Sequence, residues 1–342
     1  MDIKDQRFGI EIELTGLSRQ RAAQVLSDHF GTRLCHDGGS YDTYSVLDSQ
    51  SRKWKIVSDA SINEECKQGR ADSTYRVEMV SPICKYEDIE TIQEIIRRLR
   101  GAGAIANSSC GIHIHVDASP HNANTLRNIT NIMASKEDLI YKALQVNVSR
   151  EHSYCKKVDE RFLEELNRKK PRTLDDVSRI WYNGEDGRYQ HYHNSRYHCL
   201  NLHSVFSKGT IEFRLFNSTT HAGKIKAYVQ LCLAISHQAL SQRCASRTKT
   251  QSTNEKYTFR TWLLRLGLIG DEFKTARLHL LEHLDGCIAW KDPAQAELQK
   301  ERLRQKKEKE HEQAAAATPT EQNQEDTEQT EAEESPGFSM SM

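Results

Sequence analysis

Three segments of the chain alternate apolar and polar residues with a period of two. They lie at residues 9–14, 111–116 and 210–215. Because side chains at i and i+2 of a strand point to the same face of a sheet, each segment predicts a strand with an apolar back and a polar front. The polar fronts consist of Glu11, Glu13, His113, His115, Glu212 and Arg214. The apolar backs consist of Ile10, Ile12, Leu14, Ile112, Ile114, Val116, Ile211, Phe213 and Leu215. If these strands share a sheet, the like charges on its polar face repel one another unless that face is in contact with water or binds ions.

The remaining hydrophobic pattern predicts helices and shorter strands. Apolar residues recur at helical spacing from Ser18, a favourable N-cap, to Phe30, and again over residues 86–99, before Gly101. Short β-branched and aromatic segments predict strands at residues 44–47, 54–57, 75–80 and 197–202. A polar and charged stretch predicts a helical insertion at about residues 121–195. Apolar periodicity predicts further helices at residues 224–240, 257–268 and 272–285.

The order of these elements is not a repeated βαβ unit, so we predict an α+β fold. It consists of a curved, largely antiparallel sheet with a charged concave face and with helices packed against its apolar face. We expect residues 1–290 to form this domain. Residues 292–313 predict a charged helix with little apolar surface, and the residues after it are too polar to offset the entropy of folding. Residues 291–342 therefore predict a charged helix and a disordered acidic tail.

The composition indicates a cellular compartment but does not distinguish between classes of binding partner. The chain has 48 basic and 48 acidic residues, but residues 311–342 contain eight acidic residues and no Lys or Arg. The first 310 residues therefore hold 48 basic and 40 acidic groups, and this surplus of +8 suits phosphate-bearing ligands and nucleic acid equally. Nine scattered cysteines without a C-x-x-C pair favour a reducing compartment. Without an apolar signal region or a membrane-length segment, we expect a soluble, cytoplasmic protein.

The charged face has the residue types of a metal-dependent phosphoryl-transfer site. The candidate metal ligands are Glu11, Glu13, Glu78, His113 and Glu212. Four carboxylates with one imidazole could hold two divalent cations, and such an oxygen-rich set favours Mg²⁺ or Mn²⁺ over Zn²⁺. Arg214, beside Glu212, can grip a phosphate through its planar fork. Each pair alone has a plainer explanation, as a solvated face, buried histidines or a cross-strand ion pair. Their combination on three strands with apolar backs favours a site.

Weaker signals have structural explanations. Residues 101–106 fit G-x-G-x-x-A, but they follow a helix, so we interpret them as a helix end. Cys110 precedes the histidine strand without an orienting third group, and we interpret it as a buried structural thiol. His191, His193 and His198 lack the paired cysteines of a zinc site. A tyrosine- and histidine-rich loop over the site is the preferred interpretation.

Four sequence blocks occur in the order found in a known superfamily. They are residues 8–13; 54–62 with 77–82; 107–115; and 196–202 with 211–216. These blocks resemble those of the carboxylate–amine ligases that include glutamine synthetase and gamma-glutamylcysteine synthetase. The closest resemblance is to the bacterial and phage proteins called putative amidoligases, and it extends over residues 8–216.

The resemblance implies a fold, a reaction and roles for individual residues. The fold is the curved antiparallel sheet of a glutamine synthetase catalytic domain, whose concave face binds ATP and metals. The reaction is ATP-dependent amide bond formation through an acyl phosphate. Glu13, Glu78 and Glu11 would hold the substrate-side metal, and His113 and Glu212 the metal that bridges the ATP phosphates. Arg214, with Arg196 as a second candidate, would steady the transferred phosphoryl group. Asp59, Ser61, Ser81 and Asn201 would help to form the substrate- and cofactor-binding pocket.

The chain departs from glutamine synthetase in ways that bear on its partners. It lacks an obvious ammonia-binding flap and a long N-terminal domain, which favours an amine larger than ammonia. The expected partners are a carboxylate and an amine, each from an amino acid, a peptide or a protein side chain, with no nucleic acid or membrane. Two alternatives stay open: a phosphagen-type kinase or metal-dependent phosphohydrolase on the same fold, and a non-enzymatic binding module. The complete set of charged residues argues against the binding module.

Overall fold

The computed structural model describes residues 2–67 and 70–316. The chain divides into two compact units, Met1–Pro293 and Ala294–Met342. The described part of the second unit belongs to α11 (Pro293–Ala316), which agrees with the charged helix predicted at 292–313. The predicted disordered tail, from residue 317 on, lies outside the described residues. None of the helices in the described ranges combines the length and the apolar character needed to cross a bilayer.

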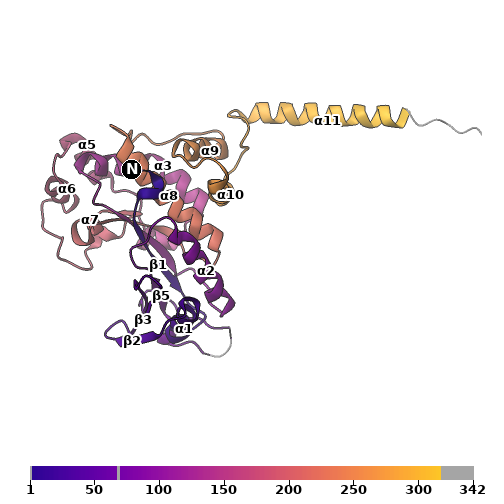
Figure 1. Ribbon diagram of the computed structural model, residues 1–342. Coiled ribbons are helices and arrows are strands. Elements are labelled where there is room, and N and C mark those ends of the chain that lie inside the picture. The colour runs from indigo at the N-terminus through magenta and orange to yellow at the C-terminus, as the bar shows by residue number, and fades with distance from the viewer. Residues whose placement is uncertain (1, 68–69, 317–342) are drawn as a thin grey trace, which may run out of the picture. The chain divides into compact units, whose positions relative to one another are not determined.

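A single sheet organises the first unit (Figure 1). Its strands are β1 (Phe8–Leu14), β2 (Leu34–Gly38), β3 (Thr43–Leu47), β4 (Lys53–Val57), β5 (Val77–Val80), β6 (Gly111–Asp117), β7 (Leu200–Asn201) and β8 (Thr210–Asn217). Their order in the sheet is β2-β3-β4-β5-β1-β6-β8-β7. Each neighbouring pair runs antiparallel, which confirms the predicted antiparallel sheet and the mixture of helices and strands.

Ten α-helices accompany the sheet in the described part of the first unit. They are α1 (Arg19–Phe30), α2 (Asp88–Gly101), α3 (Ala123–Leu144), α4 (Val148–Ser153), α5 (Glu160–Lys169), α6 (Leu174–Trp181), α7 (His203–Lys208), α8 (Ala222–Ser241), α9 (Glu255–Arg265) and α10 (Lys274–Leu281). Short 3-10 helices are η1 (Ile3–Asp5), η2 (Ser73–Tyr75), η3 (Asn194–Arg196) and η4 (Asp271–Phe273). The Ser18 hydroxyl accepts a hydrogen bond from the Arg21 amide at the start of α1, as the sequence predicts.

The apolar backs of the strands form the hydrophobic core. Ile12 and Leu14 of β1, Ile112 and Ile114 of β6 and Phe213 of β8 are fully buried. Helix α8 contacts β6, α3 contacts β8, and α1 contacts β3 and β4. The apolar residues of these helices belong to the same buried cluster as the strand backs. The helices therefore cover the apolar face, which leaves the polar face of β1, β6 and β8 for a site.

Local capping changes some predicted boundaries. The strand predicted at 75–80 begins only at Val77, because Asp72 caps the 3-10 turn η2. The strand predicted at 197–202 shrinks to β7, because η3 extends to Arg196 and His198 makes only an isolated bridge, to Lys156. After β7, the Asn201 side chain accepts a hydrogen bond from the His203 amide (2.9 Å) as the chain turns into α7. Strand β2, which the pattern does not predict, is a largely exposed edge strand without the alternation of a half-buried one.

Helix α3 has a polar sequence but is largely buried. It lies in the stretch predicted as a helical insertion, and it contacts α8 as well as β8. The amide nitrogens of two interior asparagines donate to backbone carbonyls. Asn128 donates to the carbonyls of Ala239 (3.2 Å) and Gln242 (2.7 Å), and Asn131 donates to that of Ala245 (3.0 Å). Buried hydrogen-bonded amides thus make a core helix look polar in the sequence.

Candidate active site

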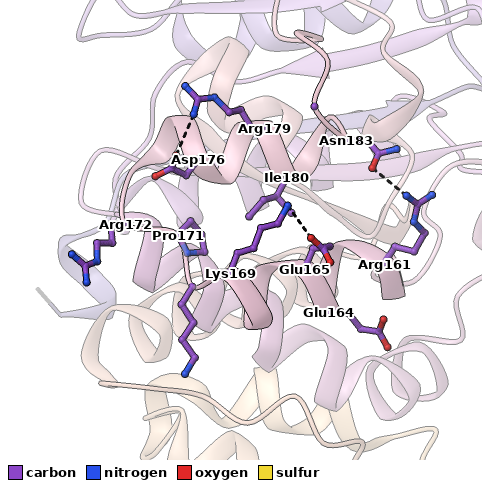
Figure 2. A pocket seen from close by; sticks show the side chains of 12 residues that line it. Arg161, Glu164, Glu165, Lys169, Pro171, Arg172, Asp176, Arg179, Ile180 and Asn183 are labelled. Carbon is purple, nitrogen blue, oxygen red and sulfur yellow. Dashed lines mark hydrogen bonds and ion pairs between the residues drawn. The ribbon is translucent and has the colours of Figure 1, made fainter.

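One large cavity in the described part of the first unit is not the candidate site. It measures about 880 Å³ and lies between α5 and α6 (Figure 2). Its charged side chains pair with one another, as Lys169 does with Glu165 (2.8 Å) and Arg179 with Asp176 (3.5 Å). Exposed pairs of this kind are typical of a solvated surface. None of the predicted site residues lines this cavity.

Strand register brings the predicted carboxylates and histidines together on the polar face. Strand β1 lies between β5 and β6 in the sheet. Glu13 is opposite Glu78 of β5, and Glu11 is opposite His113 of β6. Residues that face each other across antiparallel strands have their Cβ atoms within about 5.5 Å. Four predicted ligands from three separate chain segments therefore meet at the centre of the sheet.

Strands β8 and β7 complete the same face from the other side of β6. His115 of β6 is opposite Glu212, and Glu212 is in turn opposite Asn201 of β7. The β6–β8 register shifts between Ile112 and Ile114, which marks a β-bulge or similar irregularity beside the site. Such irregularities re-aim side chains and are frequent next to functional sites.

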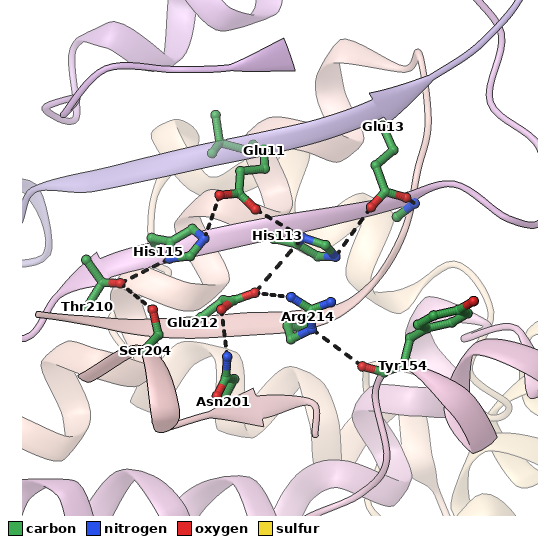
Figure 3. A network of polar contacts seen from close by, with 12 residues as sticks. Glu11, Glu13, His113, His115, Tyr154, Asn201, Ser204, Thr210, Glu212 and Arg214 are labelled. Atoms are coloured by element: carbon green, nitrogen blue, oxygen red, sulfur yellow. Dashed lines mark hydrogen bonds and ion pairs between the residues drawn. The ribbon is translucent and has the colours of Figure 1, made fainter. Parts of the chain in front are cut away.

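His113 lies at the centre of this network (Figure 3). Its Nδ1 atom is 3.2 Å from Oε2 of Glu11 and 4.0 Å from Oε1 of Glu212, and its Nε2 atom is 3.8 Å from Oε1 of Glu13. Two groups of possible metal-ligand atoms result, and the atoms within each group lie within 4.8 Å of one another. They are Glu13, Glu78 and His113, and Glu11, His113 and Glu212. Distance thus groups Glu11 with His113 and Glu212, whereas the family resemblance pairs it with Glu13 and Glu78.

Arg214 is buried and oriented by its neighbours. Its Nη1 atom donates to Oε1 of Glu212, and its Nε atom donates to the carbonyl of Tyr154 (3.5 Å). The other Glu212 oxygen accepts from Nδ2 of Asn201 (2.7 Å). Burial raises the pKa of Glu212, but the charges of Arg214, His115 and His113 outweigh burial and lower this pKa to about 2. Glu212 is therefore ionised at neutral pH and holds the guanidinium in place.

Glu13 and Glu78 face each other, and nearby positive charges do not offset the burial of their carboxylates to the same extent. Burial raises the pKa of Glu13 to about 7, although the charge of Arg150 and a hydrogen bond from the Gly111 amide (2.6 Å) act in the opposite direction. Burial and the charges of Glu11 and Glu13 raise the pKa of Glu78 well above its ordinary value. A divalent cation between Glu13 and Glu78 would remove this repulsion, so the residues fit a metal.

The two histidines differ in protonation. Burial and the charge of Arg214 lower the pKa of His113 to about 4, so this imidazole is neutral and available as a metal ligand. Burial also lowers the pKa of His115, but Glu11 and Glu212 outweigh it and raise this pKa above the ordinary value. Burial raises the pKa of Glu11, yet His115 and His113 bring it well below the ordinary value. The Glu11 side chain is therefore ionised at neutral pH.

The network forms the wall of a cavity of about 730 Å³. Four further predicted residues, Asp59, Ser61, Arg196 and Asn201, also line it. Arg196 lies at the rim, where its guanidinium is 5.5 Å and 5.7 Å from the ring centres of Tyr192 and Tyr197. Arg196 therefore contacts aromatic rings rather than the carboxylate network, although it lines the same cavity as Arg214.

Ser81 lies beside this cavity and not in its wall. Its hydroxyl accepts a hydrogen bond from the Ile10 amide (2.9 Å) and donates to the carbonyl of Pro82 (2.9 Å). It lines a smaller cavity of about 300 Å³ next to the first. The strand pattern places Ser81 near the site but does not reveal that its hydroxyl ties β5 to β1.

The structure adds residues that the sequence pattern does not reveal. Arg150 of α4 is buried and lines the cavity, where it donates to the carbonyls of Ser109 (3.5 Å) and Arg214 (3.3 Å). A side chain at Gly111 would collide with this guanidinium, which explains the glycine there. The Tyr41 and Tyr192 hydroxyls share a hydrogen bond of 2.9 Å at the cavity. No spacing in the sequence links these segments, so only their contacts identify them.

The structure agrees with the interpretation of the tyrosine- and histidine-rich loop, of the G-x-G-x-x-A segment and of Cys110. Tyr189, His191 and Tyr192 line the cavity, as expected for a loop over the site. Helix α2 ends at Gly101, as interpreted for the G-x-G-x-x-A segment. Cys110 is buried and its thiol donates to Oδ1 of Asn107 (3.4 Å). Burial raises the pKa of this thiol, which argues against a nucleophile.

One comparison with known proteins identifies the chain. A family model described as "putative amidoligase enzyme" matches residues 4–236. The matched range contains the whole eight-stranded sheet and the complete charged network. No curated protein matches the chain. The family indicates a ligase-type enzyme whose substrates are, in general, a carboxylate and an amine. Because the match covers most of the chain, this protein belongs to the putative amidoligase family, as its sequence motifs predict.

Proposed function

We propose that this protein is an ATP- and Mg²⁺-dependent ligase that joins a carboxylate to an amine through an acyl phosphate. The observation that carries the proposal is the pair of overlapping ligand groups that share His113, next to the buried guanidinium of Arg214. An oxygen-rich donor set with one neutral imidazole suits Mg²⁺ or Mn²⁺. A fixed arginine beside such a set suits a phosphoryl group in transfer.

The residues of the network have separable tasks in this proposal. Glu13 and Glu78 would hold one Mg²⁺, and Glu11 and Glu212 a second, with His113 as a ligand to one of the two, because a neutral imidazole has one lone pair to donate. Bound Mg²⁺ supplies charge neutralisation on the ATP phosphates. Glu212 has a second task, because it orients Arg214 through their ion pair. Asn201 keeps the other Glu212 oxygen in place through its hydrogen bond.

Arg214 would stabilise the transferred phosphoryl group. A substrate carboxylate oxygen bonds to the γ-phosphorus of ATP, the bond from that phosphorus to the β–γ bridging oxygen breaks, and ADP leaves. The amine then attacks the acyl carbon, loses a proton and releases inorganic phosphate. Negative charge spreads over the phosphoryl oxygens in the first step, and a pre-oriented guanidinium lowers the barrier because it needs no rearrangement.

The shape of the site is compatible with a nucleotide and a second substrate. A cavity of about 730 Å³ lies within the range typical of small-molecule sites. Its rim carries Tyr41, Tyr192 and Tyr197, whose rings offer flat apolar surface for a planar group. We further propose that the sheet is curved, with this face concave as in the glutamine synthetase catalytic domain. An experimental structure superposed on that domain tests the curvature.

Hydroxamate trapping tests the reaction. The protein is incubated with ATP, Mg²⁺, hydroxylamine and a panel of amino acids and short peptides, so that hydroxylamine replaces the unknown amine. We expect one acid to give a hydroxamate with wild-type protein, and none with Glu13→Gln or Arg214→Lys. Glu165→Gln, an exposed carboxylate of α5 that pairs with Arg168, is the matched control and should keep wild-type activity.

Each other outcome has a distinct meaning. Near-normal hydroxamate formation by Glu13→Gln would show that the site is assigned incorrectly. A phosphorylated small molecule, or free phosphate without a hydroxamate, would favour the kinase or phosphohydrolase alternative. Failure to bind ATP in calorimetry, with a folded wild-type protein, would favour a binding module.

A further inference from the structure

Gly9 leaves a gap on the polar face of β1. It precedes Glu11 by two residues, so both positions point to the same side of the sheet. Its backbone does not lie in the positive-φ region where glycine is favoured. A Cβ atom at this position would have Oγ of Ser81 at 3.9 Å and Cβ of His115 at 4.0 Å, which are ordinary contacts. Neither backbone conformation nor crowding explains this glycine, although glycine weakens a strand interior.

The space over Gly9 is the smaller cavity of about 300 Å³. Its lip includes Ile83, a large apolar side chain that is 68 % exposed, and Pro82. Glu11, Val80 and Lys208 line both this cavity and the larger one. The two cavities are therefore neighbours that meet at the metal-binding face.

Lys208 supplies the charge where the two cavities meet. Its Nζ atom is 3.9 Å from Oε1 of Glu11, a long ion pair, and its side chain is half-exposed. Glu11 itself contacts both histidines more closely, at 3.2 and 3.3 Å. Arg7 and Asp117, which also line the small cavity, already form an ion pair with each other (2.6 Å). His115, which also lines this cavity, already contacts Glu11 (3.3 Å) and Thr210 (3.0 Å) with its two ring nitrogens. An added carboxylate would therefore find its cation at Lys208.

We infer that the small cavity binds the acid substrate, an amino acid that is free or N-acylated. This inference rests on the proposed ligase function and assigns one substrate to one part of the site. The apolar side chain lies over Gly9 against Ile83, and the carboxylate reaches Lys208 at the boundary with the larger cavity. A space of about 300 Å³ is at the small end of ligand sites, so it suits an amino acid rather than a nucleoside triphosphate.

The direct test measures binding of the acid without catalysis. Ligand-observed NMR is recorded in EDTA with the free and N-acetylated forms of leucine, methionine and phenylalanine. Gly9→Val fills the cavity, and Gly9→Ala fills it in part. Lys208→Met removes the charge and Lys208→Arg keeps it. The matched control is Lys53→Met, because Lys53 has the same 51 % exposure and an ion pair with Asp37 but lines neither cavity.

We expect at least one compound to bind wild type. Gly9→Val should lose about tenfold or more in affinity, because valine occupies the space of the ligand, and Lys208→Met should lose as much, since one charged hydrogen bond is worth that. Gly9→Ala and Lys208→Arg should retain part of the affinity, and Lys53→Met all of it. Gly9→Val should melt at or above the wild-type temperature, because valine favours strands. Binding of ATP with Mg²⁺ should be unchanged in Gly9→Val, because the nucleotide occupies the other cavity.

Two binding results would each overturn the inference: unchanged affinity in Gly9→Val, or no binding of these compounds to wild type. Hydroxamate assays separate this failure from that of the proposed function. Equal hydroxamate formation by wild type and Gly9→Val would leave the ligase standing and remove the cavity assignment. Binding that Gly9→Val abolishes, with no hydroxamate from wild type, would keep the cavity and remove the ligase.

Discussion

Replacing Glu13 by Gln should stabilise the metal-free protein at alkaline pH and abolish its response to Mg²⁺. Glu13 is buried opposite Glu78, and no Lys or Arg among the described residues forms an ion pair with it; the imidazole 3.8 Å away, that of His113, is neutral. Gln has the same shape and can still accept the hydrogen bond from the Gly111 amide. The substitution therefore removes the buried charge and leaves the packing in place.

The magnitude follows from the pKa of Glu13. Burial raises this pKa from 4.5 to about 7, so the folded protein holds the proton more tightly than the unfolded chain does. The stability that this proton contributes is fully present below pH 4.5 and is lost as the pH rises through 7. At 1.36 kcal/mol per pKa unit, wild type is less stable than an uncharged variant by about 1 kcal/mol at pH 5 and about 3 kcal/mol at pH 8.

Urea unfolding in EDTA at pH 5 and pH 8 measures this difference. The free energy of unfolding of Glu13→Gln should exceed that of wild type at both pH values, with the larger gain at pH 8. With Mg²⁺ in place of EDTA, wild type should gain stability at pH 8 more than at pH 5, because the cation competes with the proton. Glu13→Gln should gain little at either pH.

The control is Glu165→Gln, which removes an exposed carboxylate and should show no gain at pH 8. A Glu13→Gln protein that is less stable than wild type at pH 8 would refute the reasoning, since Glu13 would then be stabilised by its surroundings. An equal gain at both pH values would refute the assigned pKa. An undiminished response to Mg²⁺ would remove Glu13 from the metal site.

Three further predictions test other parts of the molecule by urea unfolding. Arg214→Ala should lower the free energy of unfolding by about 3 kcal/mol or more, because Glu212 stays buried without its guanidinium; a change below 1 kcal/mol would contradict the ion pair's role. Phe213→Ala should cost about 3–5 kcal/mol, because this fully buried ring lies on the apolar back of β8; a small loss would show that the core there is loosely packed. Gly9→Ala should raise stability by about 0.4–1 kcal/mol, because alanine fits the strand conformation and restricts the unfolded chain; a large loss would mean that the gap over Gly9 is already filled.

Much of the site was predictable because alternation along a strand is local. The period of two in 9–14, 111–116 and 210–215 fixes which side chains share a face, whichever strands pair. The structure confirms this for β1, β6 and β8, whose apolar backs are buried and whose polar residues meet in one network. The family could also be recognised from the sequence, because its motifs are short blocks of particular residue types in a fixed order along the chain.

Elements with mixed polarity were harder to predict. Helix α3 has a polar sequence but is buried, because its amides bond to distant carbonyls that the sequence does not reveal. The short β7 follows η3 and an isolated bridge, and a side-chain hydrogen bond at Asn201 accompanies its turn into α7. Such contacts compete with propensities of similar size, so the pattern alone does not decide between strand and turn.

The sequence by itself determined which residues could form a charged face and which would form its apolar support. Only the tertiary structure decided the neighbours on that face: that Glu13 faces Glu78, that His113 lies within reach of three carboxylates, and that Arg150 stands behind Gly111. It also revealed the cavity over Gly9, which has no sequence signal beyond a single glycine. The physical reason is that side-chain direction is set by the local backbone, whereas register and cavities depend on packing between distant segments.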